Sequence, residues 1–287
     1  MAQSVHTSLL VIGGAEDKAG RATVLRRFVR LAGGRKARIV VIPTASSLAQ
    51  EALETYAGVF GRLGAAQVVA VDPASRRDAG SEALVQAIEH ATGVFMTGGN
   101  QLKLSQRLVG TPLADAVSRA HARGAVVAGT SAGASIMSRF MISLGADGVT
   151  PRQRTGQLTS GLGLLPDVIV DQHFDQRARY GRLMSMVAGS PNLLGMGIDE
   201  DTAAEIRDGR NLTVLGTGAV FIVDARTAVS NIAEARRHAP LLISGAVVHS
   251  LPTGTTFDLH TAQLIGFVEK RPDLRIKAAS EEPADTG

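Results

Sequence analysis

A serine lies at the centre of a Gly-x-Ser-x-Gly pattern, Gly129–Gly133, in which Ser131 is the middle residue. The apolar run Ala125–Ala128 before it predicts a buried strand, and the small residues from Ala134 onward predict the start of a helix. A serine at such a strand-to-helix turn, or nucleophile elbow, has a strained backbone that pushes its hydroxyl out of the sheet. The helix start supplies free N–H groups for a developing oxyanion. The pattern therefore indicates a serine nucleophile, with a turn that has no chemistry as the alternative.

A serine nucleophile needs a general base, and the base needs an acceptor that orients it. Of the seven histidines in the chain, only His173 follows a strand of the predicted parallel sheet. We therefore expect His173 to be the base, and the alternative is a structural histidine bonded to a loop carbonyl. Spacing does not choose between the four candidates for the acceptor, which are Asp171, Asp199, Glu200 and Asp201.

Arginines and glycines near these positions suggest how a substrate is held. Guanidinium groups beside a general base favour carboxylate binding, although a solvated helix face predicts the same pattern. Gly98 and Gly99 allow backbone to approach a ligand closely, so that an N–H group there could complete an oxyanion hole; a plain strand-end turn is the alternative. The arginines that follow the predicted base are Arg177, Arg179 and Arg182.

Apolar runs that alternate with segments of helical period predict the scaffold. This alternation favours a parallel sheet covered by helices on both faces. Ligands bind at the carboxyl ends of such strands, where the unusual residues of this chain collect. The predicted strands are Leu9–Ile12, Arg38–Ile42, Val68–Val71, Gly93–Met96, Ala125–Ala128, Val168–Val170 and Leu194–Ile198.

The remaining segments are expected to extend one domain. Residues 141–163 are rich in glycine and predicted to be irregular. From about Ala203 the pattern changes to short strands with tight turns, which we interpret as an extension of the sheet. Residues 1–277 are predicted to form a single α/β domain, and the acidic residues 278–287 a flexible tail. In the first helix, Arg26, Arg27 and Arg30 lie largely off the apolar face, as on a solvated helix face.

Composition excludes several classes of function. The 287 residues include no cysteine, which excludes disulfides, thiolate metal sites and a cysteine nucleophile. The sequence has neither a membrane-length apolar run nor a signal peptide, so a cytoplasmic location is expected and no membrane partner. The formal net charge of +4 favours an acidic substrate. Scattered basic residues and only 3% aromatic residues argue against nucleic acid as a partner.

Four motifs, in order, resemble the cyanophycinase family of serine peptidases, which is related to the aspartyl dipeptidases. The resemblance runs from about Leu9 to about Val268. It implies a three-layer α/β sandwich with a mainly parallel central sheet, of the class I glutamine-amidotransferase-like (flavodoxin-like) type, with a C-terminal extension of short strands. The motifs are Gly98–Gln101, Gly129–Gly133, Asp171–Phe174 with Arg177, Arg179, Arg182 and Leu183 after it, and Gly197–Ala203.

The resemblance also implies residue roles. It implies a catalytic triad of Ser131, His173 and Glu200, a choice of acid that spacing could not make. The N–H groups of Gly99 and Ala132 are expected to form the oxyanion hole. The substrate contacts that it implies come from Gln101, Asp171, Gln172, Arg177, Arg179 and Arg182.

The implied reaction is the cleavage of cyanophycin by an exopeptidase. Cyanophycin is a polyaspartate with arginine on each β-carboxyl, and the products are β-Asp-Arg dipeptides. The usual members of the family are intracellular homodimers that need no metal, so we expect no cofactor. The order serine, histidine, acid differs from the α/β-hydrolase order and counts against that fold.

Other functions remain open. An aspartyl or isoaspartyl dipeptidase would share the triad, although the late strands around Ile243–Leu259 resemble the longer cyanophycinase type. A glutamine-amidotransferase-like enzyme would use a cysteine, which this chain lacks. A non-catalytic binding protein on the same fold would bind a ligand tightly and turn nothing over.

Overall fold

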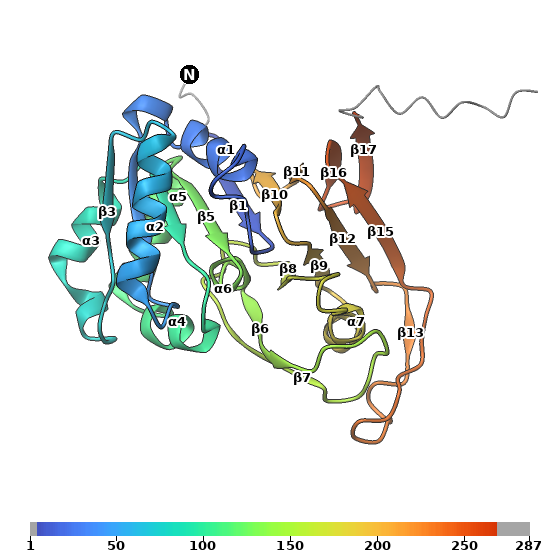
Figure 1. The fold of residues 1–287 in the computed structure, drawn as a ribbon. Helices are drawn as coiled ribbons and strands as arrows, with labels where there is room; N and C mark the ends of the chain where they lie inside the picture. The colour runs from blue at the N-terminus through green and yellow to red at the C-terminus, as the bar shows by residue number, and fades with distance from the viewer. Residues whose placement is uncertain (1–4, 269–287) are drawn as a thin grey trace, which may run out of the picture.

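A nine-stranded sheet forms the centre of the computed structural model, which describes residues 5–268 (Figure 1). The strand order is β17-β16-β11-β10-β1-β5-β4-β2-β3. The predicted tail, residues 278–287, lies outside the described residues, and the single domain over residues 1–277 stays a prediction. The five parallel neighbours are β1 (Ser8–Ile12), β5 (Val126–Thr130), β4 (Gly93–Met96), β2 (Arg38–Ile42) and β3 (Gln67–Ala70).

Four antiparallel strands continue the sheet beyond β1. They confirm the predicted C-terminal extension of short strands, because β10 pairs with β1 and β11 with β10. Their bounds are β10 (Thr202–Arg207), β11 (Asn211–Gly216), β16 (Thr255–Asp258) and β17 (Gln263–Phe267).

Helices cover both faces of the parallel strands and make the predicted three layers (Figure 1). On one face α1 (Thr23–Leu31) and α2 (Ala49–Arg62) bury a cluster of aromatic rings against the sheet. On the other face lie α3 (Glu82–Glu89), α4 (Gln101–Leu108) and α5 (Pro112–Ala122). Two short 3-10 turns, Gly34–Lys36 and Asp78–Gly80, complete this part.

The arginines of α1 differ from the prediction at one position. Arg26 and Arg30 are exposed, as expected for a solvated helix face. The side chain of Arg27 is only 24% exposed, because its guanidinium binds the buried carboxylate of Glu205. That partner lies far along the chain, so helical period alone could not find it.

The strands that carry the histidine and the acidic residues form a second sheet, which corrects the prediction of one sheet. Its order is β15-β12-β9-β8, and β8 and β9 are parallel. They do not join the nine-stranded sheet, because β10 already occupies the free edge of β1. The bounds are β8 (Val168–Gln172), β9 (Leu194–Ile198), β12 (Ala219–Asp224) and β15 (Val247–Pro252), with α7 (Tyr180–Gly189) packed on them.

The prediction that residues 141–163 are irregular is wrong, because they form most of a hairpin. Its strands, β6 (Phe140–Gly145) and β7 (Gly156–Ser160), pair with a register shift between Ile142 and Leu144. A bulge of this kind breaks the alternation by which a strand is recognised. The remaining elements are α6 (Ala132–Ser135), β13 (Val229–Ser230) and β14 (Ile243–Ser244). Among the described helices, none combines the length and the apolar character needed to cross a bilayer.

Candidate active site

Ser131 lies at the turn between β5 and α6, with a backbone φ of 52° and ψ of −112°. A Cβ at Gly129 would overlap the carbonyl oxygen of Gly133, and one at Gly133 would overlap that of Met96. Only glycine allows such close approaches, which explains why the motif needs a glycine on either side of the serine. The Ser131 N–H donates to the carbonyl of Ile12 at 3.0 Å and holds the strained turn in place.

His173 follows β8 and approaches Ser131 from the second sheet. Its Nε2 lies 3.0 Å from Oγ of Ser131, and its Nδ1 lies 2.6 Å from Oε1 of Glu200. The His173 backbone has a φ of 48°, and its N–H donates to the carbonyl of Gly13 at 2.8 Å. The ring lies against Gly14, where any Cβ would overlap it. The structure thus brings a hydroxyl, an imidazole and a carboxylate into contact in that order.

The three acidic residues after β9 have different partners. Asp199 is 7% exposed and accepts two backbone N–H groups, so it fixes the shape of the loop. Asp201 accepts the N–H of Asp17 at 2.8 Å and ties two loops together. Of these three carboxylates only Glu200 contacts the imidazole of His173 in the described part of the chain.

The surroundings of His173 favour its neutral form. Burial lowers the pKa of the imidazole, and repulsion by the guanidinium groups of Arg177 and Arg179 acts in the same direction. Glu200 opposes this shift, but the net pKa stays below its ordinary value. A neutral imidazole can accept the proton of the Ser131 hydroxyl at neutral pH. Arg177 itself is exposed and acts on the imidazole through its charge.

Two backbone N–H groups beside the serine are available to an oxyanion. Gly98 packs on Ser131, since a Cβ there would lie 3.2 Å from the serine Cβ. Gly99 has a φ of 138° and fits closely over the carbonyl of Ala45. The N–H groups of Gly99 and Ala132 donate to no acceptor within residues 5–268. Donors of this kind stabilise the charge that develops when a carbonyl is attacked.

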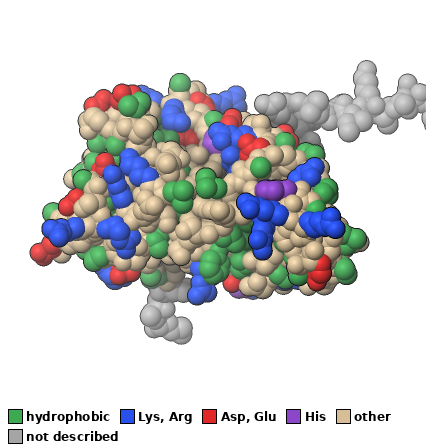
Figure 2. All heavy atoms as spheres, turned by 90° about the horizontal axis from the view of Figure 1, so that it is seen from below, with side chains coloured by type: hydrophobic (Ala, Val, Ile, Leu, Met, Phe, Trp, Pro, Cys, Tyr) green, Lys and Arg blue, Asp and Glu red, His purple; other side chains and the backbone are tan. Residues whose placement is uncertain are grey.

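A pocket of about 670 Å³ adjoins Gly99 and brings three predicted substrate residues together. Its lining includes Gln101, Arg179 and Arg182. The Gln101 amide is oriented by a bond of 2.6 Å to the carbonyl of Ile142. Figure 2 views the molecule from below Figure 1, onto the side where β1 and β5 end, and shows Lys and Arg side chains beside a His. Within residues 5–268, no group of three His, Asp or Glu side chains is arranged to hold a metal ion.

Two predicted substrate residues lie beneath this pocket. Asp171 is 1% exposed and forms an ion pair with both Nε and Nη2 of Arg182. Gln172 is 4% exposed; its Oε1 accepts from Arg179 at 3.1 Å and lies 3.5 Å from Oγ of Ser131. The structure therefore places Asp171 where it holds guanidinium groups in position, and Gln172 between an arginine and the serine.

A buried carboxylate that the sequence did not single out supports the serine from below. Glu16 is 3% exposed and accepts from the hydroxyls of Tyr56 at 2.5 Å and Thr130 at 2.6 Å, while Lys18 lies 3.1 Å away. Because Thr130 precedes Ser131, this network anchors the strained turn. The signal in the sequence was an acidic residue in the loop after the first predicted strand, four positions beyond Ile12.

Comparisons with known proteins give the family and the fold of this chain. Residues 9–214 match the family model described as Peptidase family S51. A cyanophycinase of Nostoc sp. is 40% identical over 271 residues, which cover 93% of this chain and 91% of that protein. A cyanophycinase of Geminocystis herdmanii is 38% identical over 272 residues, 94% of this chain and all of that protein. The crystal structure of a peptidase from an acI-B1 Actinobacterium has the same fold, with a TM-score of 0.64, 21% identity and coverage of 89% and 98% of the two chains.

Proposed function

We propose that this chain, which belongs to peptidase family S51, is a serine-type exopeptidase that hydrolyses cyanophycin to β-Asp-Arg dipeptides. The observation that carries the proposal is the order of contacts, with 3.0 Å from the Ser131 hydroxyl to the His173 imidazole and 2.6 Å from there to the Glu200 carboxylate. These are hydrogen-bond distances, and the three groups are those that acyl transfer needs.

The reaction follows from these contacts. Ser131 Oγ attacks the carbonyl carbon of an α-peptide bond between backbone aspartates, and Nε2 of His173 takes the hydroxyl proton. The N–H groups of Gly99 and Ala132 stabilise the oxyanion, and Glu200 stabilises the imidazolium. The imidazolium then protonates the leaving amine. A water molecule, deprotonated by the same imidazole, hydrolyses the acyl-serine ester and restores the hydroxyl.

The pocket beside the serine suits a substrate that carries carboxylates. Arg179 and Arg182 line it with both side chains 6% exposed, so their guanidinium groups are poorly screened by solvent. Arg182 already pairs with Asp171 through Nε and Nη2, and Nε and Nη1 of Arg179 also have partners, so both arginines attract a carboxylate through their charge. Gln101 and Gln172 supply amide groups, and Arg177 adds charge at the exposed edge. A β-linked arginine on an aspartyl backbone presents a carboxylate to these residues.

We also propose that the chain is a cytoplasmic homodimer. This rests on the family resemblance. Light scattering on the purified protein measures the mass in solution, and a monomer at micromolar concentration would contradict the dimer.

Incubation of the purified protein with cyanophycin, followed by mass spectrometry of the soluble fraction, tests the proposed reaction. We expect β-Asp-Arg dipeptides from the wild type and none from Ser131→Ala. Release of amino acids from Asp-X or isoaspartyl dipeptides alone would instead indicate a dipeptidase. Tight binding without turnover, equal in both proteins, would indicate a non-catalytic binding protein.

A serine-directed phosphonate reagent gives an independent test of the nucleophile. We expect one covalent adduct, mapped to Ser131 by peptide mass spectrometry. Ser135→Ala is the matched control, because Ser135 lies in the same turn region and makes no side-chain hydrogen bond in the described structure. An adduct that persists in Ser131→Ala at another serine would remove the nucleophile assignment.

A further inference from the structure

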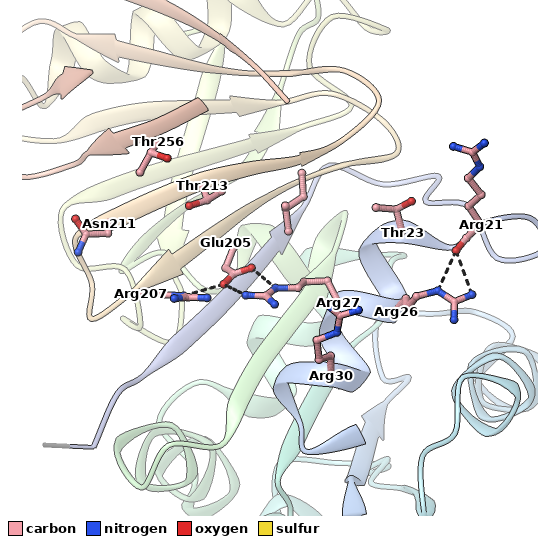
Figure 3. Close-up of a pocket in the computed structure, with 11 residues that line it drawn as sticks. Arg21, Thr23, Arg26, Arg27, Arg30, Glu205, Arg207, Asn211, Thr213 and Thr256 are labelled. Carbon is pink, nitrogen blue, oxygen red and sulfur yellow. Dashed lines mark hydrogen bonds and ion pairs between the residues drawn. The ribbon is translucent and has the colours of Figure 1, made fainter. Parts of the chain in front are cut away.

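An arginine-lined hollow of about 790 Å³ lies between α1 and the strands β10, β11 and β16 (Figure 3). Its lining contains none of the three residues assigned to the triad. The formal net charge of the whole chain is only +4, whereas the lining of this one hollow includes five arginines and a single carboxylate, that of Glu205. The arginines are Arg21, Arg26, Arg27, Arg30 and Arg207.

Glu205 fixes two of these guanidinium groups. Its side chain is 3% exposed and accepts from Nε of Arg27 at 2.6 Å and from Nε of Arg207 at 2.9 Å. Burial alone would raise the pKa of Glu205, but the two arginines hold it below its ordinary value, so the carboxylate stays charged. Nη1 of Arg27 and both Nη atoms of Arg207 donate to no acceptor within residues 5–268. They remain available to a ligand.

The other three arginines add charge that no acidic residue of α1 compensates. The helix sequence Thr23–Leu31 contains no Asp or Glu. Arg26 and Arg30 are four residues apart, a spacing at which like charges repel each other on a helix. With Arg21 they are exposed on the rim of a hollow that already holds two fixed guanidinium groups. In Figure 3 the side chains of Arg21 and Arg26 point away from Glu205, and the Arg26 guanidinium donates to the carbonyl of Arg21 at 3.4 Å. An anion bound in the hollow would relieve this repulsion.

The lining indicates the class of that anion. Planar guanidinium groups match carboxylates, which they bind through two parallel hydrogen bonds. Asn211, Thr213 and Thr256 add small polar groups. The residues that line the hollow include no aromatic side chain on which a base could stack, so the site does not suit a single-stranded nucleic acid. A symmetric contact with the same face of a second copy would bring the same positive charge and be repelled.

The shape of the hollow suits an extended chain rather than a small ion. It follows β11 from Leu215 to Asn211, roughly 13 Å at about 3.3 Å per residue. At one end of the hollow, Arg21 follows a loop in which the N–H of Asp17 donates to the carboxylate of Asp201. Asp201 is the residue directly after Glu200. A polymer held in the hollow therefore lies close to the loop that carries the triad acid.

We propose that this hollow is a second binding site, for a peptide polymer that carries carboxylates. The inference rests on the proposed function for the identity of the ligand, which is then cyanophycin: each arginine joined through its amino group keeps a free carboxylate. The site holds the polymer while one of its ends enters the pocket beside Ser131. Its loss therefore weakens the affinity for the polymer and leaves the chemical step intact.

The double variant Arg26→Ala/Arg30→Ala tests the site, because it removes two charges and keeps both ion pairs of Glu205. The matched control is Arg77→Ala/Arg236→Ala, which removes two exposed arginines that do not line the hollow. We expect KM for soluble cyanophycin to rise roughly fivefold to tenfold in the first variant only, as charge-assisted contacts are lost. We expect kcat, and KM for an oligomer of two β-Asp-Arg units, to stay at the wild-type value. Added salt should raise KM less steeply in the variant than in the wild type.

The outcomes separate this site from the proposed function. Equal KM values for the polymer in the two double variants would overturn the second site, while turnover by the wild type would leave the proposed function standing. If the wild type releases no dipeptide, the proposed function fails, and fluorescent poly-L-aspartate becomes the probe. Weaker binding of that probe by Arg26→Ala/Arg30→Ala alone would then support the site, and equal binding by both variants would overturn it.

Discussion

The pocket beside the serine and the hollow over β11 use the same arrangement, in which a buried carboxylate holds two arginines. In the pocket, Asp171 is 1% exposed and forms ion pairs with Arg179 and Arg182. In the hollow, Glu205 is 2% exposed and holds the guanidinium groups of Arg27 and Arg207. Each carboxylate holds its two arginines in place and lowers the net positive charge of its region by one.

The two regions differ in burial and in the groups that lie beside their arginines. Both pocket arginines have side chains that are 6% exposed, whereas in the hollow the values are 24% for Arg27 and 54% for Arg207. Both regions adjoin residues with a positive φ, which are Ser131 and His173 at the pocket and Ala22 and Asp208 at the hollow. At the pocket these residues are the nucleophile and the base, whereas the hollow has neither. The comparison indicates that arginines alone provide binding, and that chemistry needs a nucleophile and a base beside them.

The largest expected effect is the loss of turnover on Ser131→Ala. Because the triad groups act as a unit, we expect kcat to fall by a factor of at least about 10⁴, with an unchanged Tm. His173→Ala should lose a similar factor. Steady-state release of β-Asp-Arg measures kcat, and Ser135→Ala is the control for a small change in the same turn. Turnover by Ser131→Ala within tenfold of the wild type would place the chemistry elsewhere.

Glu200→Gln is expected to have the next largest effect. A glutamine keeps the shape of the side chain but cannot stabilise the imidazolium, so kcat should fall by about 10²- to 10⁴-fold without loss of the fold. Asp201→Asn is the control, because Asp201 binds a backbone N–H group and does not touch His173. If Asp201→Asn or Asp199→Asn were damaging and Glu200→Gln silent, the acid of the triad would be misassigned.

The free energies of unfolding of two variants test the arrangement of carboxylate and arginines that the pocket and the hollow share. Asp171→Asn leaves two buried guanidinium groups with the exposed carboxylate of Asp147 as their remaining counter-charge, and we expect the free energy of unfolding to fall by about 3 kcal/mol. Glu205→Gln leaves arginines that solvent reaches, and we expect a loss of about 1–2 kcal/mol. Urea unfolding measures both values. Equal losses would mean that the difference in burial does not distinguish the two regions.

The elements with local signals were predictable from the sequence. The five parallel strands appear within about two residues of their predicted bounds, because continuous apolar runs are typical of strands buried on both faces. The turn at Ser131 followed from its two glycines, whose close contacts the structure displays. The assignment of β8 and β9 to the same sheet as β5 was wrong, because strand pairing across the chain is not a local property.

The partners of side chains could not be predicted for the same reason. Sequence spacing left four acids open, and only the resemblance selected Glu200. That Asp171 lies under Arg182, and that Glu16 bonds to Thr130, depend on segments that folding brings together. A helix period predicted a solvated Arg27, whereas its carboxylate partner belongs to a strand 178 residues away.

The smallest expected effect concerns the pH dependence of activity. The acid limb of kcat/KM reports the pKa of the base in the free enzyme. Burial lowers the pKa of His173, and the charge of Arg177 lowers it further. Arg177→Ala removes this repulsion and should raise the pKa toward its ordinary value. The variant therefore needs a higher pH to keep its imidazole neutral, and its acid limb should move to higher pH.

Two further variants fix the sign of this shift. Arg177→Lys keeps the positive charge, so its acid limb should coincide with that of the wild type. Glu200→Gln removes the carboxylate that raises the pKa of His173, so its limb should move to lower pH wherever residual activity can be measured. Because Arg177 is exposed, salt should reduce the difference between Arg177→Ala and the wild type. Coincident limbs for Arg177→Ala and Arg177→Lys would show that the exposed guanidinium of Arg177 leaves the base untouched, and that burial, Glu200 and Arg179 set its pKa.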